Sequence, residues 1–195
     1  LNLNNGQGNH SLNLENRGTG TVNMTVGGTG AGEPNTFTGA RASNMSFTGQ
    51  QNSVIDVTVR NNTLTNNHPS NNIGGSSMFY QSAGTMTFHV TGNTMRDANG
   101  SAVTFFKGAG AGTPTMNGFF DNNTIGVAGV TDSGSLTGNG IFVSAGGTGS
   151  MSYTITNNQI VNPATTCTIT VPVTTANTPT TGTCPQANNT NGSAN

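Results

Sequence analysis

Carboxylate side chains are the most obvious candidates for chemistry in this 195-residue chain, and there are only 6 of them: Glu15, Glu33, Asp56, Asp97, Asp121 and Asp132. Hydrolysis of a glycosidic bond needs two carboxyl groups, about 5–10 Å apart, on either side of the bond. The acids do not recur at any shared position of a repeated motif, so the sequence gives no reason for two of them to meet within one chain. We therefore expect no catalytic residues and a protein that is not an enzyme.

Histidine and cysteine residues do not have the spacing of a metal site. His10, His68 and His89 are dispersed along the chain, whereas a zinc site needs several ligands that converge on one point. We expect neither a metal nor another cofactor. Cys167 and Cys184 flank a Thr-rich stretch without further metal ligands, which favours a disulfide over two free thiols. This bond would stabilise the segment by about 3 kcal/mol and would imply an oxidising compartment.

A turn sequence that contains Asn recurs four times and is the strongest structural signal in the chain. The repeated residues are Asn62, Asn93, Asn123 and Asn158, at steps of roughly 30–35 residues, a period typical of solenoid proteins. Asn tolerates the left-handed conformation and bonds to local backbone groups, so it suits a tight turn. Stacked in successive turns of a solenoid, these side chains can form a ladder along its axis.

Apolar residues alternate with polar ones on both sides of each repeated Asn. Before Asn62 they are Ile55, Val57 and Val59, and Leu64 follows it. The other repeated Asn residues have apolar neighbours at the same positions, apart from one Gly. A period of two predicts a strand with one buried face.

A second strand is expected before each of these, joined to it by a short link of small residues. The expected second strands cover residues 12–14, 45–47, 78–80, 103–105 and 141–143. An earlier, weaker copy of the longer strand covers residues 22–26, with Thr29 in the place of the Asn. Each repeat unit, or rung, would then contain a first strand, a turn, a longer strand, the Asn turn, a short third strand and a variable loop.

This order of strands and Asn turns resembles the right-handed parallel β-helix, the pectate-lyase-like superfold, and most closely the repeats of secreted bacterial surface adhesins. The resemblance implies an all-β solenoid of about five to six rungs, each of roughly 30–35 residues, within residues 1–162. Residues 163–195 would form a separate Thr- and Asn-rich segment with the expected disulfide loop. An antiparallel β-sandwich is the alternative, although it gives no reason to keep one side chain in register.

Enzymes of this superfold generally carry their chemistry on the first strand of each rung. The outward positions of the expected first strands include one acid, Glu15, and no Arg, so the calcium-binding acids and the catalytic Arg of the lyases have no counterpart. These positions also include Phe79, Phe106 and Phe142, of which Phe79 and Phe142 should share a column. Such an aromatic strip can mark a binding face unless loops cover it. The chain has no Trp, so a protein–protein contact is the expected use.

The overall composition excludes some partners. Charged residues make up 6% of the chain and the net charge is −1, so there is no basic surface for nucleic acid. No apolar run is long enough to insert into a membrane. A Thr-rich solenoid could bind ice through a flat Thr array, and Thr63, Thr94 and Thr124 would form one column, which Gln159 interrupts. The neighbouring column is irregular, so ice binding is the third hypothesis.

Together these features predict a non-enzymatic structural or adhesive β-helix module of an extracellular bacterial surface protein or fibre. A partner would be recognised by the loops after the Asn turns, residues 65–75, 96–100 and 126–138, because these vary while the strands do not. The expected partners are further copies of the protein, a surface receptor or a glycan. The competing hypothesis is a carbohydrate-active enzyme of tailspike or polysaccharide-lyase type whose acids meet between subunits.

Overall fold

The computed structural model describes residues 2–4, 9–30, 33–66, 77–81, 83–110, 112–161, 167–170, 181–184 and 189–190. Every regular element in these segments is a β-strand, from β1 (Asn2–Asn4) to β19 (Asn189–Thr190), and none is a helix. The expected parallel β-solenoid is confirmed. Strands of successive rungs pair in parallel, which excludes the antiparallel sandwich.

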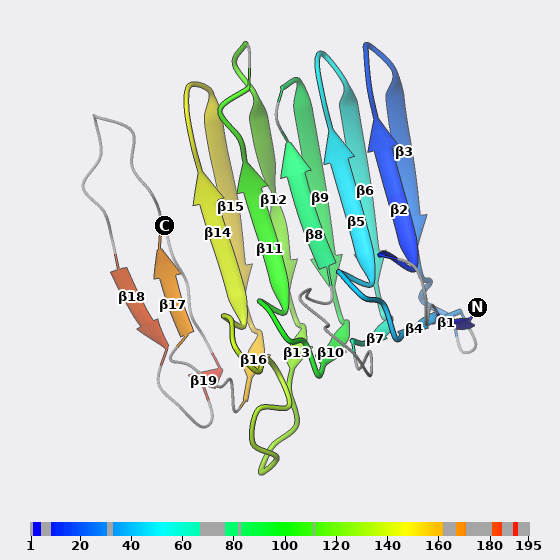
Figure 1. Cartoon of the computed structure of the whole chain (residues 1–195), viewed down its shortest axis with the longest axis vertical. Helices are drawn as coiled ribbons and strands as arrows, with labels where there is room; N and C mark the ends of the chain where they lie inside the picture. Colours follow the sequence, from blue (N-terminus) through cyan, green and yellow to red (C-terminus); the bar gives the residue numbers. More distant parts are fainter. Residues whose placement is uncertain are drawn as a thin grey trace.

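Equivalent strands of successive rungs form three parallel sheets (Figure 1). The first sheet contains β2 (Leu12–Asn16), β5 (Met45–Gly49), β8 (Ser77–Gln81), β11 (Val103–Lys107) and β14 (Ile141–Ala145). The second sheet contains β3 (Thr21–Val26), β6 (Val54–Arg60), β9 (Thr85–Thr91), β12 (Thr115–Asp121) and β15 (Ser150–Thr156). The third sheet contains β1, β4 (Thr36–Thr38), β7 (Thr63–Thr65), β10 (Thr94–Arg96), β13 (Thr124–Ile125), β16 (Gln159–Ile160) and β19. In this sheet only β19 is antiparallel to its neighbour, which is β16.

Figure 1 also shows the hand of the coil. The strands of the first sheet run upward in front, the strands of the second sheet run downward behind them, and each turn carries the chain toward the left of the view. This path is right-handed, the hand that strand twist favours for connections between parallel strands. Each long sheet is 5-stranded, and because five stacked strands enclose only four complete turns, the solenoid makes about 4 turns instead of five to six.

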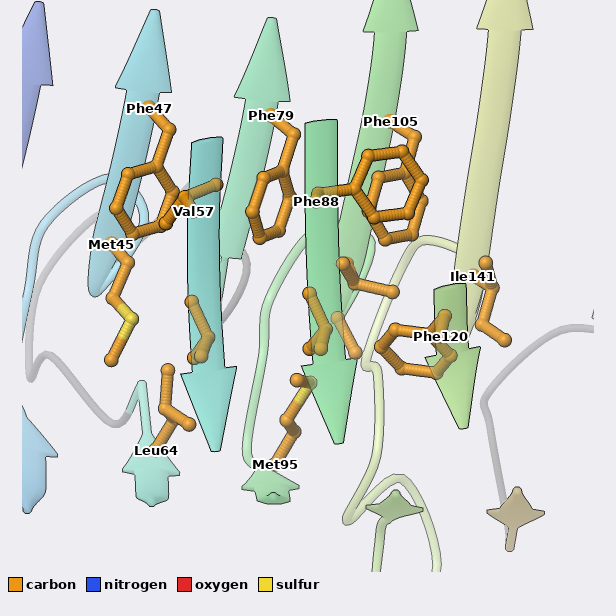
Figure 2. Close-up of a cluster of buried hydrophobic side chains, with 14 of the residues drawn as sticks. Met45, Phe47, Val57, Leu64, Phe79, Phe88, Met95, Phe105, Phe120 and Ile141 are labelled. Atoms are coloured by element: carbon orange, nitrogen blue, oxygen red, sulfur yellow. The ribbon is translucent and has the colours of Figure 1, made fainter. Parts of the chain in front are cut away.

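Buried apolar side chains from alternate positions of the strands fill the space between the sheets (Figure 2). Aromatic rings form the centre of this core: Phe47, Phe79 and Phe105 stack with 5.0 Å between successive ring centroids. Phe88 of the second sheet lies against the stack, with its centroid 4.4 Å from that of Phe105. Aromatic side chains bury a large area each, so a narrow core can be stable in a chain of low apolar content.

Phe79 is fully buried in this stack, so its expected place on the outer face is wrong. The ladder pairs Phe79 with Phe47 on one side and with Phe105 on the other, which shifts β8 by one residue from the expected alignment. A shift of one residue moves every side chain of a strand to the opposite face. Tyr80, and not Phe79, therefore shares a register position with Phe106.

The first rung contains a ladder Asn at position 35, and not at the expected Thr29. Phe37 of β4 pairs with Leu64 of β7, which places Asn35 one step before the strand, as in later rungs. The side-chain amide and the backbone N–H of Asn35 both donate to Oδ1 of Asn62, at 3.0 and 3.2 Å. In this rung a longer loop between β3 and β4 separates the long strand from the ladder Asn in the sequence.

The repeated Asn side chains form a continuous hydrogen-bonded ladder at the corner between the second and third sheets. They are Asn62, Asn93, Asn123 and Asn158, all buried. In each step, the Oδ1 atom of one Asn accepts both the backbone N–H and the side-chain amide of the Asn one rung earlier, at 2.9 to 3.1 Å. Each amide also donates to a backbone carbonyl, such as that of Val59 at 2.9 Å from Asn93. The ladder thus satisfies polar groups that burial would otherwise leave unpaired.

The residue before each of these four Asn residues forms the tight turn itself. Asn61, Gly92, Asn122 and Asn157 all adopt left-handed backbone conformations, with φ of 55°, 67°, 55° and 54°. Gly adopts this conformation without steric cost, and Asn is among the few other residues that tolerate it. In the Asn-Asn pairs, the first residue therefore makes the turn and the second makes the ladder.

Cys167 and Cys184 occupy opposite positions of the antiparallel ladder between β17 (Cys167–Thr170) and β18 (Thr181–Cys184). Residues opposite each other in such a pair have Cα atoms about 4.5–5.5 Å apart, a separation that a disulfide can span. The backbone register is therefore compatible with the expected disulfide, which stays a prediction.

Candidate interaction surfaces

The acidic residues of the two long sheets are separate surface groups. Glu15 on β2 accepts a hydrogen bond from Gln50 at 2.7 Å and pairs with Arg17 at 2.8 Å. Asp56 and Asp121 both lie on the second sheet, but two strands apart and at different register positions. Among the described residues, no group of three or more His, Cys, Asp or Glu could hold a metal ion.

Two acids that are distant in the sequence do lie on adjacent loops. The backbone N–H of Asp97 donates to the carbonyl of Ser133 at 2.7 Å, so Asp97 and Asp132 lie beside the same contact. Both residues have a left-handed backbone, with φ of 55° and 60°. The sequence suggested that all acids are scattered, because a contact between two loops leaves no periodic trace.

Two of the three loops that were expected to recognise a partner are described by the structure. Residues 96–100 and 126–138 are in contact with each other, and Ala98 forms a parallel bridge with Ser135. Most of the third loop, residues 65–75, lies outside the described residues, as does His68 within it.

The loop of residues 126–138 is ordered by its own hydrogen bonds, and it extends below β13 in Figure 1. Oγ of Ser133 accepts the backbone N–H of Val127 at 2.7 Å and donates to the carbonyl of Val130 at 2.8 Å. The backbone N–H of Leu136 donates to the carbonyl of Ala98 in the preceding rung at 2.8 Å. These bonds fix the loop both internally and against the solenoid.

This loop exposes two large apolar side chains. Val130 is 50% exposed and Leu136 is 51% exposed. Single exposed apolar residues are common on protein surfaces, and this loop carries two of them on the same loop as Asp132 and next to the loop of Asp97. We call residues 97–100 and 126–138 the loop edge.

The outer face of the first sheet carries a shorter aromatic strip than expected. Phe106 and Phe142 are both half-buried. Phe142 pairs with Thr104 and Phe106 pairs with Ser144, so the two Phe residues are diagonal neighbours on adjacent strands. Diagonal neighbours lie about 7–8 Å apart, within reach of aromatic side chains. Of the expected strip, Phe106 and Phe142 therefore lie on the outer face and Phe79 does not.

The outer face of the second sheet carries an exposed aromatic residue that the sequence did not reveal. Phe119 on β12 is 54% exposed. Its ring meets the ring of His89 on β9 edge to face, with 5.8 Å between centroids. Nε2–H of His89 donates to Oδ1 of Asp121 at 3.0 Å. The buried Gly118 and Phe120 on either side of Phe119 make the alternation hard to recognise, because the core position there is a Gly. We call His89, Phe119 and Asp121 the aromatic–acid patch.

The carboxylate of Asp121 is held by two further donors. Thr91 Oγ1 donates to Oδ2 at 3.2 Å, and Asn122 Nδ2 donates to the same atom at 2.7 Å. The hydroxyl of Thr91 bonds to the carboxylate and not to His89, so the group lacks the nucleophile–base–acid order of a catalytic triad. The patch combines an aromatic face with fixed hydrogen-bonding groups, which suits binding.

A row of Thr residues follows the third sheet. It contains Thr36, Thr63, Thr94 and Thr124, followed by Gln159. In the neighbouring row Thr38 pairs with Thr65, and Arg96 follows. The two-column Thr array is therefore confined to two strands.

Two other titratable side chains contact backbone carbonyls. Nζ of Lys107 donates to the carbonyls of Gly146 and Thr148 in the next rung, the latter at 2.7 Å. Burial lowers the pKa of Lys107. Nδ1 of His10 lies 2.9 Å from the carbonyl of Ser43. Lys107 thus connects the turns of two neighbouring rungs.

In the part of the chain that the structure describes, no helix is long and apolar enough to cross a membrane. Comparisons with protein-family models, with curated proteins and with solved structures found no match to this chain. Its function therefore has to be inferred from the surfaces that the solenoid displays.

Proposed function

We propose that this protein is a structural and adhesive module of a secreted bacterial surface protein or fibre. In this role the solenoid acts as a stiff support and the loop edge contacts a protein partner, either a further copy or a surface receptor. The Asn ladder supports the proposal because it ties each rung to the next through buried hydrogen bonds. A disulfide between Cys167 and Cys184 would suit an extracellular environment. The module would act without a cofactor.

The observation that carries this proposal is the loop edge. Val130 and Leu136 are half-exposed on a loop whose conformation Ser133 fixes from within. A rigid loop loses less conformational entropy on binding than a flexible one, so its contacts contribute more fully to affinity.

An attachment assay tests the adhesive role. Beads that carry the protein should be retained on surfaces coated with mucin, collagen or fibronectin, or the free protein should self-associate in sedimentation experiments. The double variant Val130→Ser, Leu136→Ser should weaken either effect about tenfold or more, as expected for central apolar contacts. Val54→Ser is the matched control, because Val54 is an exposed apolar residue on the second sheet. Neither retention nor self-association of the unmodified protein would contradict the proposal.

A carbohydrate-active enzyme is the second candidate, and one observation favours it. Asp97 and Asp132 lie beside the same contact between loops, and glycoside hydrolysis needs two nearby acids. Release of reducing ends from polysaccharides, abolished by Asp97→Asn and by Asp132→Asn, would support this activity. Ice binding is the third candidate, favoured by the Thr row, and a thermal-hysteresis measurement tests it.

A further inference from the structure

Phe119 is a single exposed ring on a polar sheet face. In register its neighbours are His89 on one side and Thr154 on the other, and Asn117 and Asp121 flank it on β12. A stable protein–protein interface buries more than about 1,000 Å² around an apolar core, which this face does not provide. A ligand that stacks on one ring and otherwise forms hydrogen bonds fits the face better.

Asp121 supplies a fixed acceptor next to this ring. Its carboxylate is held in place by His89, Thr91 and Asn122. An ionised carboxylate has about four acceptor sites, so the three donors leave room for a hydroxyl of a ligand. Hydrogen bonds to charged acceptors are the stronger ones. Because Phe119 and Asp121 are two residues apart on one strand of a parallel sheet, about 6.6 Å separates their Cα atoms, a distance that one sugar ring can span.

The charges on this face are mixed and do not form a basic surface. Arg60 and Asp121 occupy the same register position two strands apart, with Thr91 between them. Asp56 adds a second carboxylate to the face. A polyanionic polymer would meet these carboxylates without an excess of positive charge to offset them, so the balance favours an uncharged ligand.

We propose that the aromatic–acid patch binds a hexopyranose ring of a neutral glycan without cleaving it. The C–H face of the ring stacks on Phe119, and its hydroxyl groups hydrogen-bond to Asp121 and His89. The glycan would be a second partner in the adhesive role proposed above, and this inference rests on that role. The site lies on the outer face of the second sheet, on a different surface from the loop edge.

Titration with defined oligosaccharides tests this site. Cellohexaose, chitohexaose and mannohexaose serve as neutral probes, and polygalacturonate as the charged comparator, in calorimetry and saturation-transfer NMR. At least one neutral probe should bind, and its affinity should fall about tenfold or more in Phe119→Ser and in Asp121→Asn. Phe119→Tyr should retain binding because it keeps the ring. Val54→Ser is the control on the same sheet face.

The proposal fails if no neutral probe binds the unmodified protein at about 10 mM, a concentration that detects even weak sites. It also fails if Phe119→Ser binds as well as the unmodified protein, or if polygalacturonate binds more tightly than every neutral probe. These outcomes do not change the interpretation of the attachment assay for the loop edge, because Val130 and Leu136 lie on a different surface. If the unmodified protein bound sugar but neither attached to the coated surfaces nor self-associated, only the role of the loop edge would be rejected.

Discussion

Asn62 and Asn93 are one rung apart, and Oδ1 of Asn93 accepts hydrogen bonds from both the backbone N–H and the side-chain amide of Asn62, at 2.9 and 3.0 Å. Asn93 in turn donates its own backbone N–H and amide to Oδ1 of Asn123. Each Asn therefore completes the hydrogen bonding of the rung before it and depends on the rung after it. Removal of one side chain leaves unpaired groups on both sides.

We expect Asn93→Leu to destabilise the fold by at least about 3 kcal/mol, because several buried polar groups lose their partners and each costs about 1–3 kcal/mol. Asn61→Gly is the matched control: Asn61 is exposed and left-handed, and Gly92 occupies the equivalent position of the next rung. Urea denaturation measures both variants. Equal midpoints for the two would show that the ladder contributes little to stability.

Phe79→Ala should destabilise the protein by about 3–5 kcal/mol, the usual effect of removing a buried aromatic side chain. Phe142→Ala should have a smaller effect, because Phe142 is half-buried on the outer face of the first sheet. Thermal unfolding of the two variants provides the comparison. A larger effect at Phe142 would place Phe79 outside the core.

Gly118→Ala should destabilise the protein by about 1–3 kcal/mol, as overpacking of a core does. A Cβ atom at position 118 would collide with the backbone carbonyl and the ring of Phe88. Gly146→Ala is the control, because a Cβ there would have its nearest neighbour at 3.8 Å. Circular dichroism melting curves should separate the two variants, and coincident curves would contradict the packing around Phe88.

Lys107→Met should loosen the turn that contains Gly146 and Thr148, because their carbonyls lose the donor that ties them to the preceding rung. Hydrogen exchange in this turn measures the effect. Burial lowers the pKa of Lys107 from 10.5, so the unfolded chain holds the proton more tightly than the folded one. The free energy of unfolding of the unmodified protein should therefore rise, relative to Lys107→Met, as the pH increases toward about 11. A constant difference between the two proteins across this range would contradict the assigned burial.

Reduction should affect only the C-terminal strands β17 and β18 if Cys167 and Cys184 form the proposed disulfide. A solenoid is stabilised by contacts between neighbouring rungs, so a bond at one end has little influence on distant rungs. Hydrogen exchange with and without reductant tests this expectation. Loss of protection at Val90 in β9 on reduction would show that the end of the chain controls the whole fold.

The ladder positions could be predicted from the sequence because the residue at this position makes the same hydrogen bonds in each rung. The residue that makes them is Asn in four rungs, at nearly constant spacing: Asn62, Asn93, Asn123 and Asn158. Asn35 has the same role, but the longer loop before Asn35 interrupts the regular spacing. Only the backbone pairing of β4 with β7 therefore identifies Asn35 as a ladder residue.

The register of β8 and the exposed patch could not be predicted for a different reason. Residues 78–80 are all large and apolar or aromatic, so alternation permits either face of β8 to be buried. Around Phe119 the alternation of apolar and polar residues is lost, because the core position is occupied by Gly118, which has no side chain. The contact of Asp97 with Ser133 depends on how two loops fold together, and neither loop encodes it alone.

Each step of the Asn ladder uses hydrogen-bonding groups of only two neighbouring rungs, and this affects how such a chain can evolve. A duplicated stretch of about 31 residues would bring its own turn-former, its own ladder Asn and its own loop, and would meet compatible neighbours on both sides. Every such duplication would lengthen the module by about 4.8 Å, the spacing of paired strands. Reach can therefore grow in fixed increments, while each copied loop is free to diverge into a new recognition element.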